Sequence, residues 1–150
     1  MPVIWEPTLV EELFDVEVVD VACGLDHSLI LCSDGTLVSG GSNVYGQLGR
    51  VKEDLGLHQV DLSHRPMSIA SGLGHSLAIC KHTSSESEKI VEVSLHGDGT
   101  RVLNLEREGS ENVPLVVDSL VGEMPISVSG GAGAFLSCDG QARGLELGLR

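Results

Sequence analysis

Aromatic side chains are scarce in this chain. Its 150 residues include two phenylalanines, one tyrosine and one tryptophan. Strands favour aromatic and β-branched residues, and this number of aromatic residues is therefore low for an all-β protein. Hydrophobic residues nevertheless make up 41% of the chain, which is enough to bury a core and excludes a disordered chain.

Basic residues are also few, with 9 Lys and Arg against 22 Asp and Glu, for a net charge of −13. Such a chain repels a phosphate backbone, so direct nucleic-acid binding is not expected. Electrostatic complementarity favours a basic protein partner. The alternative is that the acidic charge only keeps the chain soluble.

The four cysteines, Cys23, Cys32, Cys80 and Cys138, include no Cys-x-x-Cys pair and no zinc-like spacing with histidine. Neither a signal peptide nor an apolar run of membrane-spanning length is recognisable. We therefore expect an intracellular protein of the cytoplasm or nucleus, with free and mostly buried thiols and no metal, cofactor or membrane partner. Cys23 and Cys32 flank one predicted hairpin and could approach each other, but buried thiols are the preferred reading.

One passage of the chain occurs twice. Residues 22–32 return as residues 70–80, and their Gly, Leu, His, Ser and Leu positions keep one offset, as from Gly24 to Gly72 and from His27 to His75. A fixed period near 50 residues indicates a repeat architecture. Repeat proteins usually offer a surface to partners rather than a single catalytic cleft.

A second match places a third copy. Residues 7–13 and 114–120 share a proline, then a valine three positions on and a leucine six positions on. We therefore expect three units, at 7–50, 51–113 and 114–150. The second unit includes a polar loop at 81–89 and an atypical, non-strand segment at 94–105. The third is a degenerate partial repeat, whose tail from residue 132 lacks the strand pattern.

The first unit reads as β-structure throughout. Alternating valines predict a strand that ends at Gly24, and His27–Cys32 and Thr36–Ser39 predict two more. Asp34-Gly35 between them favours a tight primed hairpin turn. Corresponding strands are expected at Met67–Ser71 and Pro125–Ser129. Three or four short strands per unit predict an all-β fold, a partial β-propeller of about three four-stranded blades.

The motifs of the first unit resemble the repeat of the regulator-of-chromosome-condensation family. They are Val21-Ala22-Cys23-Gly24, His27-Ser28-Leu29, Asp34-Gly35 and Gly46-Gln47-Leu48-Gly49. The resemblance implies a seven-bladed propeller of which this chain holds fewer than half the blades. It suggests a partial or truncated, plant-type member, similar to the ultraviolet-B receptor or to guanine nucleotide exchange factors. The expected structural motif residues are Gly24, His27, Asp34, Gly35, Gly46, Gln47, Gly49, Gly72 and His75.

The resemblance fails after the hairpin of the second unit, and the genetic code suggests why. Suitable synonymous codons for residues 95–106, read from the last base of the Leu95 codon, encode the missing family motif Ser-Trp-Gly-Trp-Asn-Gln-Ser-Pro-Gln-Leu-Gly. We therefore hypothesise a local displacement of the reading frame, which would also account for the shortage of aromatics. Trp5 is the sole tryptophan, so the receptor activity, which depends on clustered tryptophans, is not carried over.

Two short segments contain residue types found in catalytic or phosphate-binding sites. Neither segment predicts a catalytic or phosphate-binding function. Asp26-His27-Ser28 has the residue types of a hydrolase triad, but neighbours on a strand point to alternate faces and cannot converge. Gly130-Gly131-Ala132-Gly133 lacks the Gly-Lys-Ser/Thr ending of a phosphate loop and is expected to be a turn with positive φ. We therefore expect no enzyme activity and no catalytic residue.

The expected function is that of a non-catalytic protein-interaction scaffold, as a piece of a larger propeller. The alternative is a regulatory guanine nucleotide exchange factor for a small GTPase. The expected partner is a protein, either a small GTPase or a basic protein.

Overall fold

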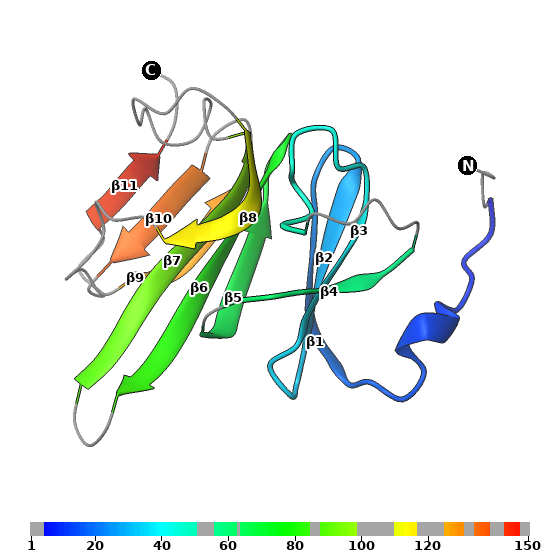
Figure 1. The fold of residues 1–150 in the computed structure, drawn as a ribbon, viewed down its shortest axis with the longest axis horizontal. Coiled ribbons are helices and arrows are strands. Elements are labelled where there is room, and N and C mark those ends of the chain that lie inside the picture. Colours follow the sequence, from blue (N-terminus) through cyan, green and yellow to red (C-terminus); the bar gives the residue numbers. More distant parts are fainter. Residues whose placement is uncertain are drawn as a thin grey trace.

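The computed structural model of the chain describes residues 5–50, 56–62, 64–84, 88–98, 110–116, 125–130, 134–138 and 143–147. In this part of the chain, strands form three antiparallel sheets and one short 3-10 helix precedes them (Figure 1). The elements are η1 (Glu11–Leu13), β1 (Val18–Cys23), β2 (His27–Cys32), β3 (Leu37–Gly41), β4 (His58–Val60), β5 (Arg65–Ser71), β6 (His75–Ser84), β7 (Glu88–Asp98), β8 (Ser110–Val116), β9 (Pro125–Gly130), β10 (Ala134–Cys138) and β11 (Arg143–Leu147).

Each sheet is a meander of strands that are consecutive in the chain. The orders are β1-β2-β3-β4, β5-β6-β7-β8 and β9-β10-β11. The first strands of the sheets are neighbours, because β5 contacts both β1 and β9. Such serial four-stranded meanders are the blades of a β-propeller, so the prediction of an all-β, partial propeller is confirmed. The third blade shows three strands among the described residues.

The sheets do not begin and end where the sequence units were expected to. β4 belongs to the first sheet, although it lies beyond residue 50. β8 closes the second sheet and extends past residue 113 to Val116. A blade therefore takes its last strand from residues that follow the recognisable sequence motif.

The predicted strands of the first unit are found close to their expected bounds, but the hairpin between β2 and β3 is of a different type. Leu31 pairs with Leu37, and Cys32 N–H donates to Thr36 O at 2.9 Å. Three residues therefore form the loop, with Gly35 N–H donating to Cys32 O at 3.0 Å and Gly35 at φ 89°. This is the three-residue hairpin loop with glycine in the left-handed conformation. The prediction of a tight primed turn was therefore wrong.

Two expectations about non-strand segments were also wrong. β6 continues to Ser84 and β7 starts at Glu88, so much of the expected polar loop 81–89 is strand. Residues 94–98 of the expected atypical segment lie in β7, and 99–105 fall outside the described residues. β6 and β7 pair along the ladder from His75↔Gly97 to Ser84↔Glu88. Backbone hydrogen bonds of this kind form whatever the polarity of the side chains.

The tail of the third unit contains strands that its sequence did not suggest. β10 and β11 pair from Ala134↔Leu147 to Cys138↔Arg143. β10 also pairs with β9, from Ala134↔Gly130 to Cys138↔Pro125. The expectation that this tail lacks strands is therefore wrong for the described residues.

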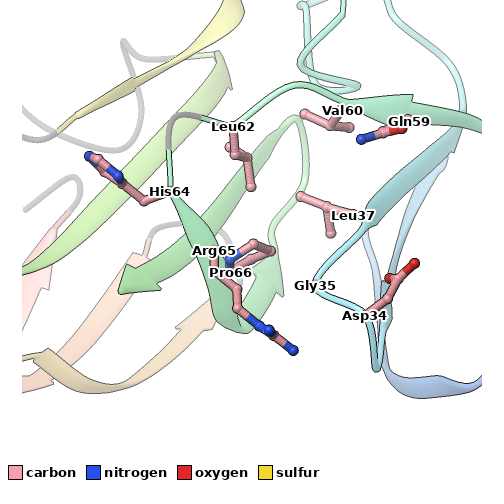
Figure 2. A pocket seen from close by; sticks show the side chains of 9 residues that line it. All are labelled: Asp34, Gly35, Leu37, Gln59, Val60, Leu62, His64, Arg65 and Pro66. Atoms are coloured by element: carbon pink, nitrogen blue, oxygen red, sulfur yellow. The ribbon is translucent and has the colours of Figure 1, made fainter. Parts of the chain in front are cut away.

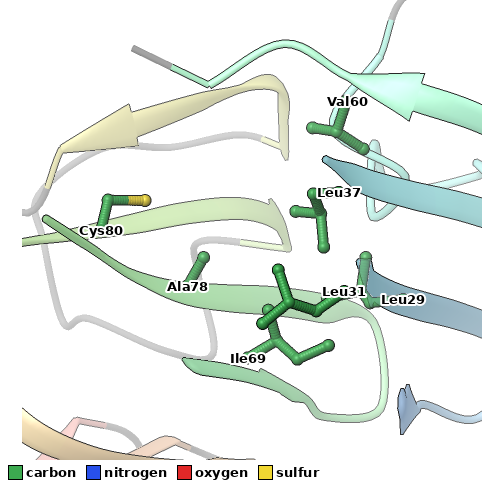
Figure 3. Close-up of a cluster of buried hydrophobic side chains, with 7 residues drawn as sticks. All are labelled: Leu29, Leu31, Leu37, Val60, Ile69, Ala78 and Cys80. Carbon is green, nitrogen blue, oxygen red and sulfur yellow. The ribbon is translucent and has the colours of Figure 1, made fainter. Parts of the chain in front are cut away.

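The core lies between the first two blades (Figure 3). Leu31 of β2 and Leu37 of β3 are cross-strand partners and point to the same face of their sheet. That face packs on β5 and β6 of the second blade. The members of the cluster are Leu29, Leu31, Leu37, Val60, Ile69, Ala78 and Cys80. Alternation along the strands selects this set, because every second side chain of a strand faces the neighbouring blade.

Candidate functional site at the junction of the first two blades

The repeated sequence motif builds the same turn in both blades. Gly24 N–H donates to His27 O at 2.8 Å in the β1–β2 turn, and Gly72 N–H donates to His75 O at 2.9 Å in the β5–β6 turn. The two turns lie at the same end of neighbouring blades. The motif glycines and histidines thus occupy equivalent places at the blade junction.

Gly24 is required by close approach and not by backbone strain. A Cβ atom at this position would lie 2.6 Å from Gly72 O and would overlap the His27 ring. Neither Gly24 nor Gly72 is among the glycines with positive φ. Gly130 repeats the arrangement, because a Cβ there would overlap Ser71 O of the second blade; it ends β9 and is not a positive-φ turn residue. Glycine therefore lets the inner ends of adjacent blades touch through their backbones.

His27 links the first blade to the second. Its Nε2 lies 2.9 Å from Ser76 Oγ, and the Ser76 hydroxyl donates to Gln47 O at 2.8 Å. His27 is 3% exposed, while Ser76 and Gln47 are fully buried. The hydroxyl hydrogen of Ser76 is used toward Gln47, so His27 Nε2 is protonated and donates to the serine oxygen. We call this chain of bonds, His27–Ser76–Gln47, the junction latch.

The junction latch brings the residue types of a hydrolase triad together across two blades. Asp26 Oδ1 lies 4.0 Å from His27 Nδ1, on the far side of the ring from Ser76. A catalytic histidine must accept the serine proton, whereas His27 donates to Ser76. The serine oxygen is also sealed from solvent. The arrangement is therefore a structural link and cannot present a nucleophile to a substrate.

Ser28 does not join His27, in line with the sequence reasoning about strand alternation. Its hydroxyl is directed at Cys23 Sγ, at 3.8 Å. The partner of His27 is Ser76, the equivalent serine one repeat later. The sequence contained the signal for it, because His-Ser occurs in both copies and the offset of the contact is one repeat plus one residue.

Burial lowers the pKa of His27, while the nearby Asp26 carboxylate and a hydrogen bond with the backbone of His75 act in the opposite direction. Within the described part of the chain, the buried Nδ1 atom has no hydrogen-bond partner. Asp26 Oδ1 is 4.0 Å from it, so a second proton on this ring would have to be held in a buried place without a hydrogen bond at Nδ1. The junction latch is therefore built for neutral histidine.

The segment after β3 is ordered by the side chain of Gln47. Its Oε1 accepts from Tyr45 N–H at 2.8 Å, and its Nε2 donates to Asp26 Oδ1 at 3.1 Å. Gly46 and Gly49 adopt positive φ angles of 76° and 66°, which explains the two glycines of the Gly-Gln-Leu-Gly motif. Gln47 thus joins the loop to the β1–β2 turn, while its backbone oxygen receives Ser76.

At the opposite end of the blades, the β2–β3 hairpin is attached to β5. Asp34 Oδ1 accepts from Thr36 N–H at 2.8 Å, a bond that holds the pKa of the Asp34 carboxyl below its usual value. Arg65 Nη2 donates to Ser33 O at 2.8 Å. The Arg65 side chain also passes close beneath Gly35, with its Cγ 3.0 Å from where a Cβ would stand.

A cavity of about 320 Å³ lies next to this attachment, between the hairpin and the start of β5 (Figure 2). Its interior is formed by the apolar side chains Leu37, Val60, Leu62 and Pro66. Polar groups stand at its rim, among them Gln59, His64 and Arg65. Sequence reasoning did not find this cavity, because its walls come from elements more than twenty residues apart.

The β1–β2 register sets Cys23 opposite Ser28 and Cys32 opposite Val18, at the two ends of the strand pair. The alternative that these two cysteines approach each other is therefore wrong. Cys23 is exposed and Cys32 is buried. In the described segments, no three His, Cys, Asp or Glu side chains gather in a way that could hold a metal ion.

The comparisons with known proteins agree with this architecture. Residues 18–47 match the family model of the regulator of chromosome condensation (RCC1) repeat. The chain therefore contains an RCC1 repeat. RCC1-family relatives include the human E3 ubiquitin-protein ligase HERC2, 33% identical over 132 residues, and the human probable E3 ubiquitin-protein ligase HERC6, 31% identical over 145 residues. These matches cover 84% and 90% of this chain but 3% and 14% of the two relatives.

Solved RCC1-type propellers share the fold. Human WBSCR16 superposes with a TM-score of 0.67 at 25% identity, over 88% of this chain and 34% of that protein. Prp20p from Saccharomyces cerevisiae superposes with a TM-score of 0.66 at 21% identity, over 95% of this chain and 33% of that protein. The finer expectation of a plant-type, ultraviolet-B-receptor-like member is not confirmed by these comparisons. In the described part of this RCC1-type chain, no helix is long and apolar enough to span a membrane.

Proposed function

We propose that the chain is a non-catalytic protein-interaction scaffold made of RCC1-type blades. The observation that supports this most directly is that the residues of the junction latch link two blades and do not form a catalytic site. In the Ser–His–Asp arrangement at the blade junction, Ser76 and His27 are buried and the histidine donates to the serine, which is the wrong direction for catalysis. The repeat motif residues serve to join the blades, which leaves the turns at the blade ends as the surface available to a partner.

The preferred partner is a basic protein. The net charge of −13 supports attraction to a positively charged surface, mainly through faster association and stronger salt dependence. Prp20p, which shares the fold, is described as binding Gsp1p and histones. A cytoplasmic or nuclear location, where such partners occur, is part of the same proposal.

Binding to purified core histones tests the scaffold proposal, with the full chain immobilised and salt varied from 50 to 300 mM. We expect saturable binding that weakens with salt, and no binding to an acidic control protein of similar size. Absence of histone binding at 50 mM salt would refute histones as the partner, and equal binding to the acidic control would refute selection of a partner by its basic charge.

The second candidate is a regulatory guanine nucleotide exchange factor for a small GTPase, and the fold shared with Prp20p favours it. The chain spans 33% of that protein, and an exchange surface would need blades beyond those in this chain. Release of a fluorescent GDP analogue from Gsp1p separates the two candidates, with Prp20p as the positive control. We expect no acceleration by the chain, and a concentration-dependent acceleration would favour the exchange factor.

A further inference from the structure

We propose that an apolar patch on the turns at one end of the first two blades is the docking surface for a protein segment in which an apolar side chain is flanked by lysine or arginine. The patch consists of Leu25, Val44, Tyr45 and Leu73, and we call it the loop patch. The proposal deepens the scaffold function above and depends on it for its biological role.

The loop patch spans two blades because its members occupy connected turns. Leu25 and Leu73 are equivalent repeat positions in the β1–β2 and β5–β6 turns, which lie at the same end of the sheets (Figure 1). The Tyr45 ring lies against the second blade, since a Cβ at Gly74 would be 3.1 Å from Tyr45 Cδ2. Gly74 stands where the first repeat has Asp26, and the missing side chain makes room for the ring. Tyr45, which lies in the segment after β3 of the first blade, therefore lies against the β5–β6 turn of the second blade.

The four apolar side chains of the loop patch are exposed to solvent, although their neighbours in the chain are buried. Leu25 is 74% exposed, Val44 78%, Tyr45 47% and Leu73 39%. Their chain neighbours Gln47 and His75 are almost completely buried. Exposed apolar side chains scattered singly are ordinary, but several on adjoining turns mark an interaction site. A tyrosine at the centre is typical of protein interfaces.

The backbone that carries the loop patch is already ordered. Tyr45 N–H is held by Gln47 Oε1 at 2.8 Å, and Gly46 N–H donates to Asn43 O at 3.1 Å. Gln47 itself is fixed from three sides, by Tyr45, Asp26 and Ser76. A partner would therefore not have to order this loop, which lowers the free-energy cost of binding.

Charge selects the partner. In the turns 24–26, 43–47 and 72–74, Asp26 is the only charged residue. Its side chain is 47% exposed. Gln47 Nε2 donates to Asp26 Oδ1, and the half-exposed carboxylate places a negative charge in the β1–β2 turn, next to Leu25. A lysine or arginine next to an apolar anchor would satisfy both features, whereas an acidic segment would be repelled.

Three capped synthetic peptides test the proposal by titration into the full chain, followed by NMR. The probe is Gly-Lys-Leu-Lys-Phe-Lys-Gly. Its controls are Gly-Lys-Ser-Lys-Ser-Lys-Gly, which keeps the charge, and Gly-Glu-Leu-Glu-Phe-Glu-Gly, which keeps the apolar side chains. We expect the probe alone to bind, with shifts at Leu25, Tyr45 and Leu73. Equal binding of the serine peptide would overturn the proposal, since it would show a purely electrostatic contact, and so would absence of probe binding.

Surface variants locate the site. We expect Leu25→Ser and Leu73→Ser each to weaken probe binding roughly tenfold, the effect of removing a central interface side chain. Asp26→Asn should weaken it less and flatten its salt dependence. The matched control is Leu9→Ser, because Leu9 is 76% exposed but precedes η1 and lies outside the loop patch. An equal effect of Leu9→Ser would overturn the proposal.

The outcome is distinguishable from failure of the scaffold function. If core histones bind the unaltered chain and the Leu25→Ser and Leu73→Ser variants equally well, the loop patch proposal is refuted and the scaffold proposal stands. If the probe binds in a Leu25-dependent way while histones do not bind, the loop patch is supported and core histones are excluded as its partner.

Discussion

Replacing Ser76 by alanine isolates the energetic role of the junction latch. The substitution removes one oxygen atom from a fully buried place and leaves two groups behind, the His27 Nε2–H donor and the Gln47 carbonyl acceptor. An unsatisfied buried donor or acceptor costs about 1–3 kcal/mol. Because the hydroxyl also no longer has to be buried, we expect Ser76→Ala to lower the free energy of unfolding by about 2–4 kcal/mol.

The chain supplies its own control, since Ser28 occupies the same repeat position in the first blade. Its hydroxyl reaches only the Cys23 sulfur, at 3.8 Å, and it is half-buried. We expect Ser28→Ala to change the free energy of unfolding by less than about 0.5 kcal/mol. The same chemical change at the same motif position thus separates the latch from any general effect of losing a serine.

Urea unfolding followed by circular dichroism measures both variants. With an m-value of about 2 kcal/mol/M, the middle of the usual range for urea, Ser76→Ala should lower the midpoint by about 1–2 M. A His27→Ala variant and the double variant complete a cycle, in which a coupling of at least about 1 kcal/mol is expected for groups in direct contact. Equal midpoints for Ser76→Ala and Ser28→Ala, or a coupling near zero, would refute the latch.

Four further outcomes are expected. Gly24→Val should destabilise the chain by about 1–3 kcal/mol in urea, because its Cβ would press on a carbonyl of the second blade; an unchanged midpoint would contradict the close approach. The lowered pKa of His27 means that the unfolded chain binds the proton more tightly. The contribution of His27 to stability should therefore be complete above pH 6.5 and be lost as the pH falls below it, and this part of the loss should be absent in His27→Gln. Iodoacetamide should label the exposed Cys23 well before Cys32, whose thiol is buried with a raised pKa, and mass spectrometry of the peptides would show the reverse order if this were wrong. Sequencing the transcript across residues 95–106 should reveal the displaced tryptophan-rich motif, and CTG followed by CAC at the first two codons would exclude it.

The sequence was sufficient for the first three strands of the first blade, but not for the fourth, which lies beyond the expected unit. Its period and its alternation of apolar residues predicted the strand His27–Cys32 at its observed bounds. The second and third blades were harder, because pairing of β6 with β7 and of β10 with β11 depends on the partner strand and not on local composition. Likewise, the loop type at Gly35 depends on the number of residues between paired strands, which the Asp-Gly dipeptide does not determine.

The residues of the site were named from the sequence, but their partners were not. The recurrence of Gly24 and His27 at one period pointed to a structural role for both. It did not reveal that Gly24 faces the Gly72 carbonyl or that His27 reaches Ser76. Both contacts join one copy to the next, and a comparison of copies aligns them side by side without showing which atoms of the two meet. The sequence likewise did not predict that Leu25 and Leu73 are exposed, because leucine at a repeated position is as typical of a buried side chain.

The offset of the His27–Ser76 contact has a consequence for how such chains can change during evolution. The contact spans one period plus one residue, so the histidine of the first copy depends on the serine of the second. Duplicating this His-Ser unit as a whole copy would keep a histidine in step with the serine of the following copy. An insertion within a copy between these positions is tolerated only if it loops out. Growth by whole units is therefore compatible with this fold in a way that growth by single residues is not.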